Sequence, residues 1–480
     1  MRHLAGLLVL ASIHLHGVTA APQVPLALPK RPIHGRFLQI TDIHPDPWYK
    51  PKSAPSHACH RKKSKKKNVA GYWGHPFEEC DTPLRLSNLT LDFLDKKWSS
   101  EIDFVVWTGD NARHDNDRKI PRTPAEIYDL NRHVADKMFS AFTSKGIPVI
   151  PSLGNNDVWH AHFCAALSPT LVQNIMMPGP NSITNEFASI WKSFIPFPHL
   201  QIFQRGAYYA VEVIPDAVAV ISLNTMYFYD SNKAVGGCLF KERDDAGNLQ
   251  FDWLEVQLKG FRARGMQVWI SGATFRRLPD PTFRECYVRY VELSLRFQDT
   301  ILGHLYGHMN VDHFFFLEAD DLNIVVEDAP KANQQPDLYK VLMQDFSAMP
   351  NAKEIDLDNY AIVSVAPSVV PNPYRRRVLL KLWTPLGFTQ YFMADLGASN
   401  KTEPPNFELE YSTFDSEVLE HGIDGWYPVP KKNLPKKLKK RQTAYGMGAL
   451  TVKEWVGLAR RVVEEEKVQS IFRSHMYVGG

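Results

Sequence analysis

Short hydrophobic runs in this chain end repeatedly in the same way, in a turn that carries the side chains that bind metal ions. A continuous apolar run of this kind is typical of a strand that is buried on both faces of a sheet. Loops that follow such strands gather at one edge of the sheet, so distant segments can meet there. In chain order the segments are Asp42-Ile43-His44, Gly109-Asp110, Gly154-Asn155-Asn156-Asp157, Ser271-Gly272-Ala273 and Gly307-His308-Met309-Asn310.

The residue types in these segments suit the hydrolysis of phosphate esters or anhydrides. That reaction needs a hydroxide and a clamp on the negative oxygens, and two divalent cations about 3.5–4 Å apart supply both. Asp110 follows the run 104–107 and a Thr-Gly turn, and it suits the carboxylate that bridges two ions. Asp42 and His44 can converge if the strand turns there. Asn155 offers an amide oxygen and His308 an imidazole nitrogen, both common ligands of such ions.

Each segment taken alone is more often a surface pair or an ordinary turn. The ordered set DxH, GD, GN, GH is the signature of the calcineurin-like metallophosphoesterases, and the chain resembles that superfamily. The longer strings at 40–47, 106–115, 154–157 and 305–314 look like those of the fungal endopolyphosphatases, which are relatives of the acid sphingomyelinases. Asn310 stands where most of the superfamily has a second histidine, and the endopolyphosphatases are similar to this chain in having asparagine.

The resemblance covers roughly residues 33–400 and implies a fold and a cofactor. The expected fold class is a layered α/β metallophosphoesterase sandwich, with two central mixed β-sheets flanked by helices and a helical, basic C-terminal region. The expected cofactor is a pair of divalent metal ions, drawn from zinc, manganese, cobalt, iron and magnesium. The expected domains are a signal peptide or signal-anchor at 1–20, a catalytic domain at 33–395 and a C-terminal region at 396–480.

The resemblance also implies a role for each segment. Asp42, His44, Asp110 and Asn310 would hold one ion, and Asp110, Asn155 and His308 the second. His114 matches the histidine that protonates the leaving oxygen in sphingomyelinase-like enzymes, a task that suits imidazole.

Arg113 has two interpretations. It could clamp a phosphate oxygen bidentately, or it could pair with Asp115 or Asp117.

Two stretches depart from the family pattern. After Ser271-Gly272 the family places a histidine that completes the second metal site, but this chain has Ala273. Residues 158–173, which include Cys164, look like an insertion. Misread intron boundaries would explain both departures, and real loss of the second ligand set is the rival explanation.

Periodicity predicts further elements around these segments. Helical spacing is found at 89–98, 127–142, 251–261 and 288–297, and strand-like runs are found at 217–223, 323–326, 361–365 and 378–382.

The N-terminus indicates the secretory pathway. A short basic start, an apolar run at 4–15 and the small residues of 18–20 are typical of a cleaved signal peptide. The related endopolyphosphatases have an N-terminal membrane anchor, so a retained signal-anchor is the alternative. The expected location is the vacuole lumen or the vacuole membrane.

In an oxidising compartment of the secretory pathway, cysteines are expected to form disulfides and sequons can accept N-glycans. Five cysteines are an odd number, and pairing Cys59 with Cys80 and Cys238 with Cys286 would leave Cys164 over. Asn88 and Asn400 begin sequons for N-glycans.

The net charge is only +3, but lysine and arginine are concentrated in the runs 61–67 and 436–441. A linear polyanion would be attracted to such runs, and Lys62 and Lys63 are the candidates for substrate binding. Solvated loops or sites for processing proteases are the plainer interpretation. Nothing predicts a specific nucleic-acid partner.

Three functions fit these observations. The first is an endopolyphosphatase that cuts internal phosphoanhydride bonds of inorganic polyphosphate. The second is a sphingomyelinase-like phosphodiesterase, against which Asn310 and the lysine runs argue. The third is an inactive polyanion-binding relative, for which Ala273 is the positive observation.

Overall fold

A computed structural model describes most of the chain. The described residues are 32–61, 68–76, 78–162, 172–275, 283–323, 337–350, 354–371, 379–393, 396 and 399–477, without the side chains of 160–162 and 172–174. The chain forms two compact units, Met1–Ile33 and His34–Gly480, and the described helices and strands all belong to the second. The predicted signal segment 1–20, Lys62, Lys63 and Cys164 lie outside the described residues.

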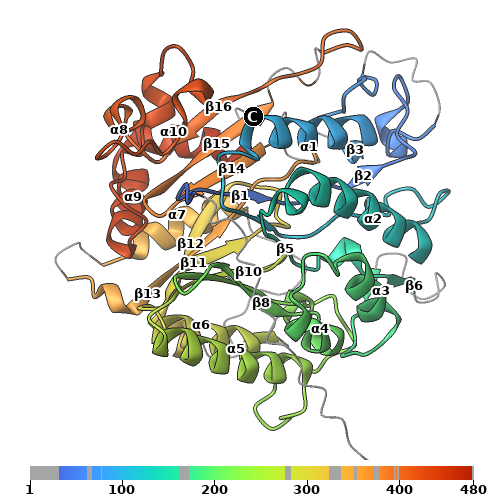
Figure 1. The fold of residues 1–480 in the computed structure, drawn as a ribbon, viewed down its shortest axis with the longest axis horizontal. Coiled ribbons are helices and arrows are strands. Elements are labelled where there is room, and N and C mark those ends of the chain that lie inside the picture. The colour runs from blue at the N-terminus through green and yellow to red at the C-terminus, as the bar shows by residue number, and fades with distance from the viewer. Residues whose placement is uncertain are drawn as a thin grey trace, which may run out of the picture. The chain divides into compact units, whose positions relative to one another are not determined.

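Two six-stranded mixed sheets form the centre of the second unit (Figure 1). The first sheet has the order β16 (Phe407–Ser412), β15 (Gly387–Met393), β14 (Leu379–Thr384), β1 (Phe37–Ile40), β4 (Phe104–Trp107), β5 (Val149–Pro151). The second has the order β12 (His313–Glu318), β13 (Tyr360–Val365), β11 (Ile301–Tyr306), β10 (Gln267–Ser271), β9 (Val218–Ser222), β8 (Tyr209–Ile214). The short pairs β2 (Pro45–Asp46) with β3 (Thr82–Pro83), and β6 (His160–His162) with β7 (Val172–Asn174), lie outside both sheets.

Each sheet contains a run of parallel strands. In the first sheet β1, β4 and β5 are parallel neighbours. In the second, β9, β10, β11 and β13 are parallel neighbours. Every residue of β1 and β4 is buried, as the apolar runs predict. The carboxyl ends of parallel strands are where open α/β sheets bind ligands, and the predicted site segments follow these ends.

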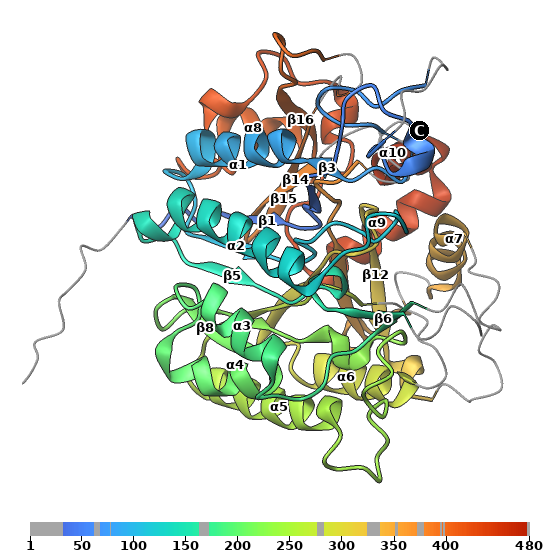
Figure 2. The ribbon, with the colours of Figure 1, turned by 90° about the vertical axis from the view of Figure 1, so that its right-hand side faces the viewer.

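Helices lie against the outer faces of the two sheets (Figures 1 and 2). Helices α1 and α2 run side by side over the first sheet, and α5 and α6 lie under the second. This arrangement confirms the predicted layered α/β sandwich. The helices are α1 (Leu84–Trp98), α2 (Pro124–Ala141), α3 (Ser182–Ile190), α4 (Leu200–Gly206), α5 (Ala246–Ala263), α6 (Arg284–Arg296), α7 (Leu338–Ala348), α8 (Ser416–His421), α9 (Val452–Glu464) and α10 (Glu466–Tyr477).

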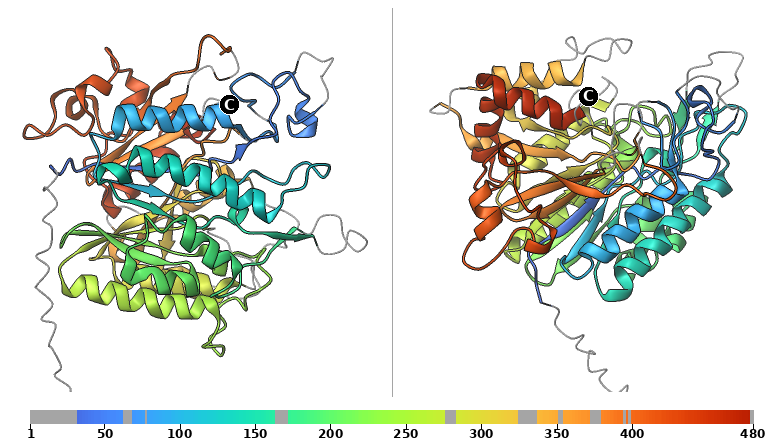
Figure 3. Two further views of the ribbon diagram at one scale, coloured as in Figure 1. Left: turned by 45° about the vertical axis from the view of Figure 1, so that its right-hand side comes forward. Right: turned by 90° about the horizontal axis from the view of Figure 1, so that it is seen from above.

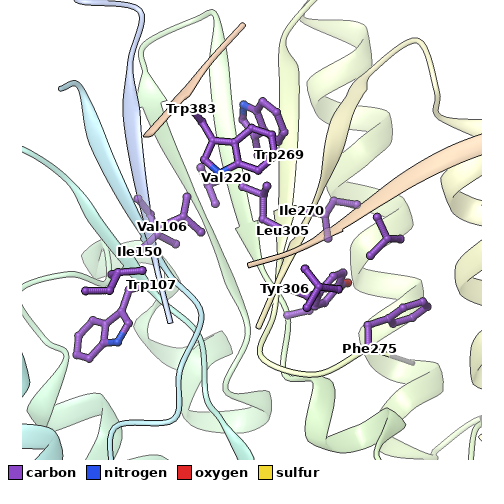
Figure 4. Packing of buried hydrophobic residues seen from close by; sticks show 14 of the residues in the cluster. Val106, Trp107, Ile150, Val220, Trp269, Ile270, Phe275, Leu305, Tyr306 and Trp383 are labelled. Carbon is purple, nitrogen blue, oxygen red and sulfur yellow. The ribbon is translucent and has the colours of Figure 1, made fainter. Parts of the chain in front are cut away.

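Aromatic side chains fill the space between the sheets. Trp383 of β14 and Trp269 of β10 face one another there, with ring centroids 5.7 Å apart (Figure 4). Phe37 of β1 packs against both indoles. Gln39, although polar, is buried without cost because its amide donates to the carbonyl oxygen of Tyr306 and accepts from Trp383 Nε1. This contact ties the two sheets together close to the carboxyl end of β1.

The C-terminal region completes this architecture. Strand β16 pairs with β15, and α9 packs on α7 and β13. Figure 3 shows the C-terminal helices, in red, beside the sheets. Residues predicted as a region of their own, 396–480, therefore supply an edge strand of the first sheet. Within the described ranges, no helix combines the length and the hydrophobicity that a membrane span requires.

The predicted helices are all present, and one predicted strand lies mostly outside the described residues. The run at 323–326 begins at Asn323, which is the last residue of a 3-10 helix, Ala319–Asn323, and residues 324–326 lie outside the described part of the chain. The acidic residues at 320 and 321 explain the helical turn, because Asp321 accepts a hydrogen bond from the backbone of Glu318 and so closes the turn locally.

Candidate metal centre

Hydrogen bonds donated by backbone amides join the loops after β1, β4 and β11 to one another. The amide of Asp42 donates to Gly109 O over 3.1 Å, and the amide of His44 donates to Asp110 O over 3.2 Å. From the second sheet, the amide of His308 donates to Asp42 Oδ2 over 2.9 Å. The site therefore lies where the carboxyl ends of both sheets meet, and its geometry is fixed by main chain.

Three of the predicted ligands form one compact group. Asp42, His44 and Asp110 each offer a ligand atom, and these atoms all lie within 4.8 Å of one another. All three side chains are almost completely buried. Carboxylates are rarely buried together without a compensating charge, so the group has the composition and the enclosure of a cation site.

Hydrogen bonds aim the ligand atoms of this group inward. His44 Nδ1 donates to the carbonyl oxygen of Ala112 over 2.7 Å, which leaves Nε2 as the atom that faces Asp42. Asp42 Oδ2 accepts from Thr41 and from the backbone of His308. A metal-binding histidine usually has its other nitrogen fixed in this way.

Some buried polar atoms in this region have no hydrogen-bond partner among the described residues, as atoms that bind a cation would not. Asp42 Oδ1, His44 Nε2 and Asn310 Oδ1 are buried and find no hydrogen-bond partner within the described part of the protein. An unsatisfied buried polar atom costs roughly 1–3 kcal/mol, so the adjacent pair on Asp42 and His44 calls for a ligand. Two oxygens and an imidazole nitrogen are the donors that zinc, manganese, iron and cobalt accept. The residues present fit a divalent metal ion.

The predicted second set is only partly assembled. Asp110 Oδ2 lies 3.8 Å from His308 Nδ1, and Asn155 is buried at the start of a 3-10 helix that follows β5. Ala273, at the end of β10, is completely buried, and its carbonyl oxygen accepts from the amide of Gly307. The backbone thus places position 273 beside the His308 loop, but its side chain is a methyl group.

The backbone around the site is strained. Five of the six predicted metal ligands have positive φ angles, between 41° and 66°, although none of them is glycine. Such conformations cost about 1–3 kcal/mol each and persist where surrounding contacts impose them, which is typical of functional sites. The five residues are Asp42, His44, Asp110, His308 and Asn310.

Two glycines allow the loops to approach this closely. A Cβ at Gly154 would lie 2.3 Å from Asp110 Oδ1, and a Cβ at Gly307 would lie 1.9 Å from Thr41 Oγ1. Any larger residue at either position would push a site loop away.

Asp157 fixes the loop that carries Asp110. Its carboxylate accepts from the backbone amides of Asp110, Asn111, Ala112 and Gly154. Burial and the charge of Asp110 raise the pKa of Asp157. Asp157 binds backbone, so it holds the ligand loop in shape without offering an atom to the ion.

His114 lies against the metal group and has a carboxylate partner that sequence reasoning missed. Its ring stacks on that of His44 with centroids 4.0 Å apart. Its Nδ1 lies 2.7 Å from Asp81 Oδ1, and its amide donates to Asp81 Oδ2 over 2.6 Å. Asp81 therefore fixes both the backbone and the ring of His114, which leaves Nε2 available. Position 81 follows Cys80 with no strand-like run before it, so no periodic signal marked it.

The charges at the site are unbalanced without a cation. Burial alone would lower the pKa of His44, but Asp42, Asp110 and Asp81 together raise it to about 9. Burial would raise the pKa of Asp81, yet the neighbouring imidazole of His114 lowers it to about 2. Acidic groups thus dominate this pocket, and they attract positive charge.

Arg113 has a different role from the one expected. It is completely buried, and its guanidinium forms a bidentate pair with Glu126, over 2.7 and 3.0 Å. The remaining donors bind the carbonyl oxygens of His114 and Ile120. The side chain of Arg113 pairs with Glu126 and has no exposed surface to offer a phosphate, because the chain folds over it and uses its donors to hold the loop after Asp110.

The first basic run begins beside a rigid structure. Cys59 and Cys80 form a disulfide, and Asp81, the partner of His114, follows directly. Between them His60 is buried, with Nε2 2.8 Å from Asp46 and Nδ1 3.0 Å from Asp117. Lys62 and Lys63 themselves lie outside the described residues.

The remaining predicted features lie away from the metal group. Cys238 and Cys286 form the second disulfide. Asn400 is exposed in a turn in which its side-chain oxygen accepts from the amides of Thr402 and Glu403, whereas Asn88 is half-buried within α1 and hydrogen-bonds to His133.

The chain has clear relatives among characterised proteins. It is 43% identical over 403 residues to the endopolyphosphatase of Cryptococcus neoformans, which covers 72% of this chain and 57% of that protein. It is 34% identical over 424 residues to the endopolyphosphatase of Schizosaccharomyces pombe, covering 84% of this chain and 68% of that protein. It is 43% identical over 294 residues to the endopolyphosphatase of Saccharomyces cerevisiae, covering 59% of this chain and 41% of that protein.

The chain spans about three fifths of the Cryptococcus relative and two thirds of the Schizosaccharomyces relative. No family model matches it. The matches extend over most of the chain and agree with a fold and a buried donor group of the metallophosphoesterase type. The chain belongs to the endopolyphosphatase family.

Proposed function

We propose that this protein hydrolyses internal phosphoanhydride bonds of inorganic polyphosphate in a metal-dependent reaction. The observation that carries the proposal is the buried group of Asp42, His44 and Asp110, in which Asp42 Oδ1 and His44 Nε2 find no hydrogen-bond partner among the described residues. The names of the relatives supply the reaction, and the sequence resemblance supplies the substrate class.

Of the two proposed ion sites, the first would have a more complete set of ligands than the second. Asp42, His44 and Asp110, together with Asn310, would form the first site. Asp110 would bridge to a second site at Asn155 and His308, which Ala273 leaves short of a ligand. Divalent ions bound there would activate water and neutralise charge on the phosphate oxygens. The buried hydrogen bonds to Asp42 and His44 keep both side chains oriented whether or not an ion is bound.

His114 would donate a proton to the departing phosphate. Its Nδ1 is engaged with Asp81, so Nε2 is the nitrogen available for the transfer. The contact between the His114 and His44 rings places this imidazole beside the metal group. A general acid held by a carboxylate within hydrogen-bond reach is the arrangement such a step needs.

The remaining proposals concern maturation and location. Two disulfides suit passage through an oxidising compartment, and we place the protein in the vacuole lumen or on its membrane. Asn400, exposed in a polar turn, is the better of the two predicted glycan acceptors. The lysine run at 61–67 would attract the polyanion.

Gel electrophoresis of the products tests the function. The full chain is incubated with long-chain polyphosphate and Mn²⁺, Co²⁺ or Zn²⁺, and then again with a chelator. Internal cutting yields a spread of intermediate chain lengths early in the reaction, whereas cutting from the ends releases orthophosphate while long chains persist. Loss of the intermediates in Asp110→Asn is expected. Equal activity in the chelator, or in Asp110→Asn, would refute the proposal.

A further inference from the structure

A buried salt bridge anchors the far end of the loop that carries His308 and Asn310. Asp312 Oδ1 lies 2.7 Å from Lys381 Nζ of β14. Asp312 Oδ2 accepts a 2.6 Å hydrogen bond from the hydroxyl of Tyr411 of β16. All three side chains are at most 5% exposed. Asp312 therefore attaches the loop to two strands of the other sheet.

Tyr411 connects this anchor to the C-terminal helix. Its ring lies flat on that of His475 in α10, with centroids 4.0 Å apart and an angle of 7° between the planes. His475 Nδ1 is 3.0 Å from the hydroxyl of Tyr445. The cavity lined by these side chains measures about 10 Å³, no more than one water molecule needs, so the groups pack directly against one another.

The anchored loop needs support from outside itself. His308 and Asn310 have φ angles of 66° and 55°, in the left-handed region that costs non-glycine residues free energy. At its start the loop is held by the bonds from Gly307 to Ala273 O and from His308 to Asp42. At its end Asp312, two residues beyond Asn310, provides the other attachment.

We propose that Asp312 and Tyr411, supported by His475 of α10, are positioning residues that hold Asn310 and His308 in the conformation that binds the metal. The C-terminal helix thereby contributes to the metal centre without contacting it. This inference rests on the proposed function, because it takes Asn310 and His308 as ligands.

A matched pair of substitutions separates positioning from general stability. Tyr411→Phe removes only the hydroxyl that binds Asp312. Tyr391→Phe removes a hydroxyl from the neighbouring strand β15, where the residue is 5% exposed and its oxygen has no hydrogen-bond partner in the described ranges. Both variants keep an aromatic ring within the first sheet.

Metal binding is the appropriate measurement, and Co²⁺ alone is the probe. The full chain is stripped of metal and titrated with Co²⁺, whose visible absorption reports the ligand geometry, and the melting of each metal-free variant is recorded. Tyr411→Phe is expected to raise the Kd about tenfold and to alter the spectrum, as partners of metal ligands do. Tyr391→Phe is expected to match the parent chain. Asp312→Asn serves as the second variant and is expected to weaken Co²⁺ binding as well.

The outcomes distinguish a failure of this inference from a failure of the proposed function. If both tyrosine variants bind Co²⁺ like the parent while Tyr411→Phe melts lower, Tyr411 is merely structural and the inference is wrong. If the parent chain binds Co²⁺ but does not cut polyphosphate, the proposed function fails and the inference is still decided by the Kd values. A parent chain that binds no metal would overturn both.

Discussion

His44 donates its Nδ1 proton to the carbonyl oxygen of Ala112 over 2.7 Å, two residues beyond Asp110. Because a carbonyl oxygen only accepts, this bond fixes the tautomer and directs Nε2 toward Asp42. A ligand on one loop thus depends on the loop of another strand for its orientation. Replacing His44 should therefore weaken metal binding strongly, because the imidazole is already held in the orientation that a ligand needs.

His44→Asn is expected to weaken divalent-metal binding by at least about a hundredfold, since the loss of a residue that only supports a ligand already costs about 10–100-fold. The measurement is the metal content of the desalted protein, with calorimetric titration of Mn²⁺. His199→Asn, at a partly exposed histidine in the 3-10 helix Phe197–His199, is the control and should bind metal normally. Retained metal in His44→Asn would mean that the ion sits elsewhere.

The pairing of Asp81 with His114 predicts that substitutions at these residues lower kcat by different factors on two substrates. His114→Ala should lower kcat on polyphosphate by about 10²–10⁴-fold, as general acids do. Asp81→Asn should lower it less, because the one amide oxygen can still accept from Nδ1, although the bond to the His114 amide is lost. On bis(p-nitrophenyl) phosphate, whose leaving group needs no proton, both losses should shrink to a few-fold. Equal losses on the two substrates would exclude His114 as the acid.

His304 predicts a loss of stability in acid. It is fully buried with Nδ1 2.5 Å from the Tyr290 hydroxyl, and burial lowers its pKa from 6.5 to about 3. Since the unfolded chain binds this proton first, the stabilisation is complete above pH 6.5 and is lost as pH falls toward 3. Between pH 6.5 and 5 the loss is about 2 kcal/mol at 1.36 kcal/mol per unit.

Urea unfolding at pH 7, 6.5 and 5 measures this effect. His304→Leu keeps a similar volume and removes the titrating group, so its unfolding free energy should fall less between pH 6.5 and 5 than that of the parent chain. His475, whose pKa burial lowers to about 4, remains in both proteins and supplies a common background. Identical pH profiles would show that His304 takes up its proton equally in the folded state.

The fold was predictable to the extent that its strands are buried on both faces. Runs such as 104–107 are continuous and apolar, and each ends in a turn with a polar residue. Strands β15 and β16 contain no long continuous apolar run, so the pattern that predicts the fully buried strands does not mark them, although Phe407–Ser412 alternates apolar and polar residues as a half-buried strand does. Their burial depends on α1 and the C-terminal segment, which lie far away in sequence.

The site was predictable where ligands follow strands. Asp42, His44 and Asp110 come together as expected, since parallel strands end at one edge. Asp81 was missed because it lies in a loop, and its partnership with His114 depends on a disulfide and a folded chain. Arg113 was misjudged because sequence cannot show that Glu126, thirteen residues on, folds back over it.

The residue encoded at position 273 distinguishes misread intron boundaries from a real loss of the ligand. If intron boundaries were misread, sequencing the transcript across codons 155–290 should reveal histidine after Ser271-Gly272 and no segment containing Cys164. If the transcript encodes Ala273 as printed, the proposed second metal site is short of a ligand in the protein itself.

Ala273→His is expected to raise the number of tightly bound ions per chain from one toward two. The backbone already binds position 273 to the Gly307 amide, so an imidazole there would adjoin the loop of His308. Metal content after dialysis at fixed free Zn²⁺ measures the change, and Ala273→Leu, which adds bulk without a ligand atom, is the control. An increase only in Ala273→His would show that the site lacks a donor and is otherwise formed. No increase, with both variants folded, would show that position 273 does not face the second ion.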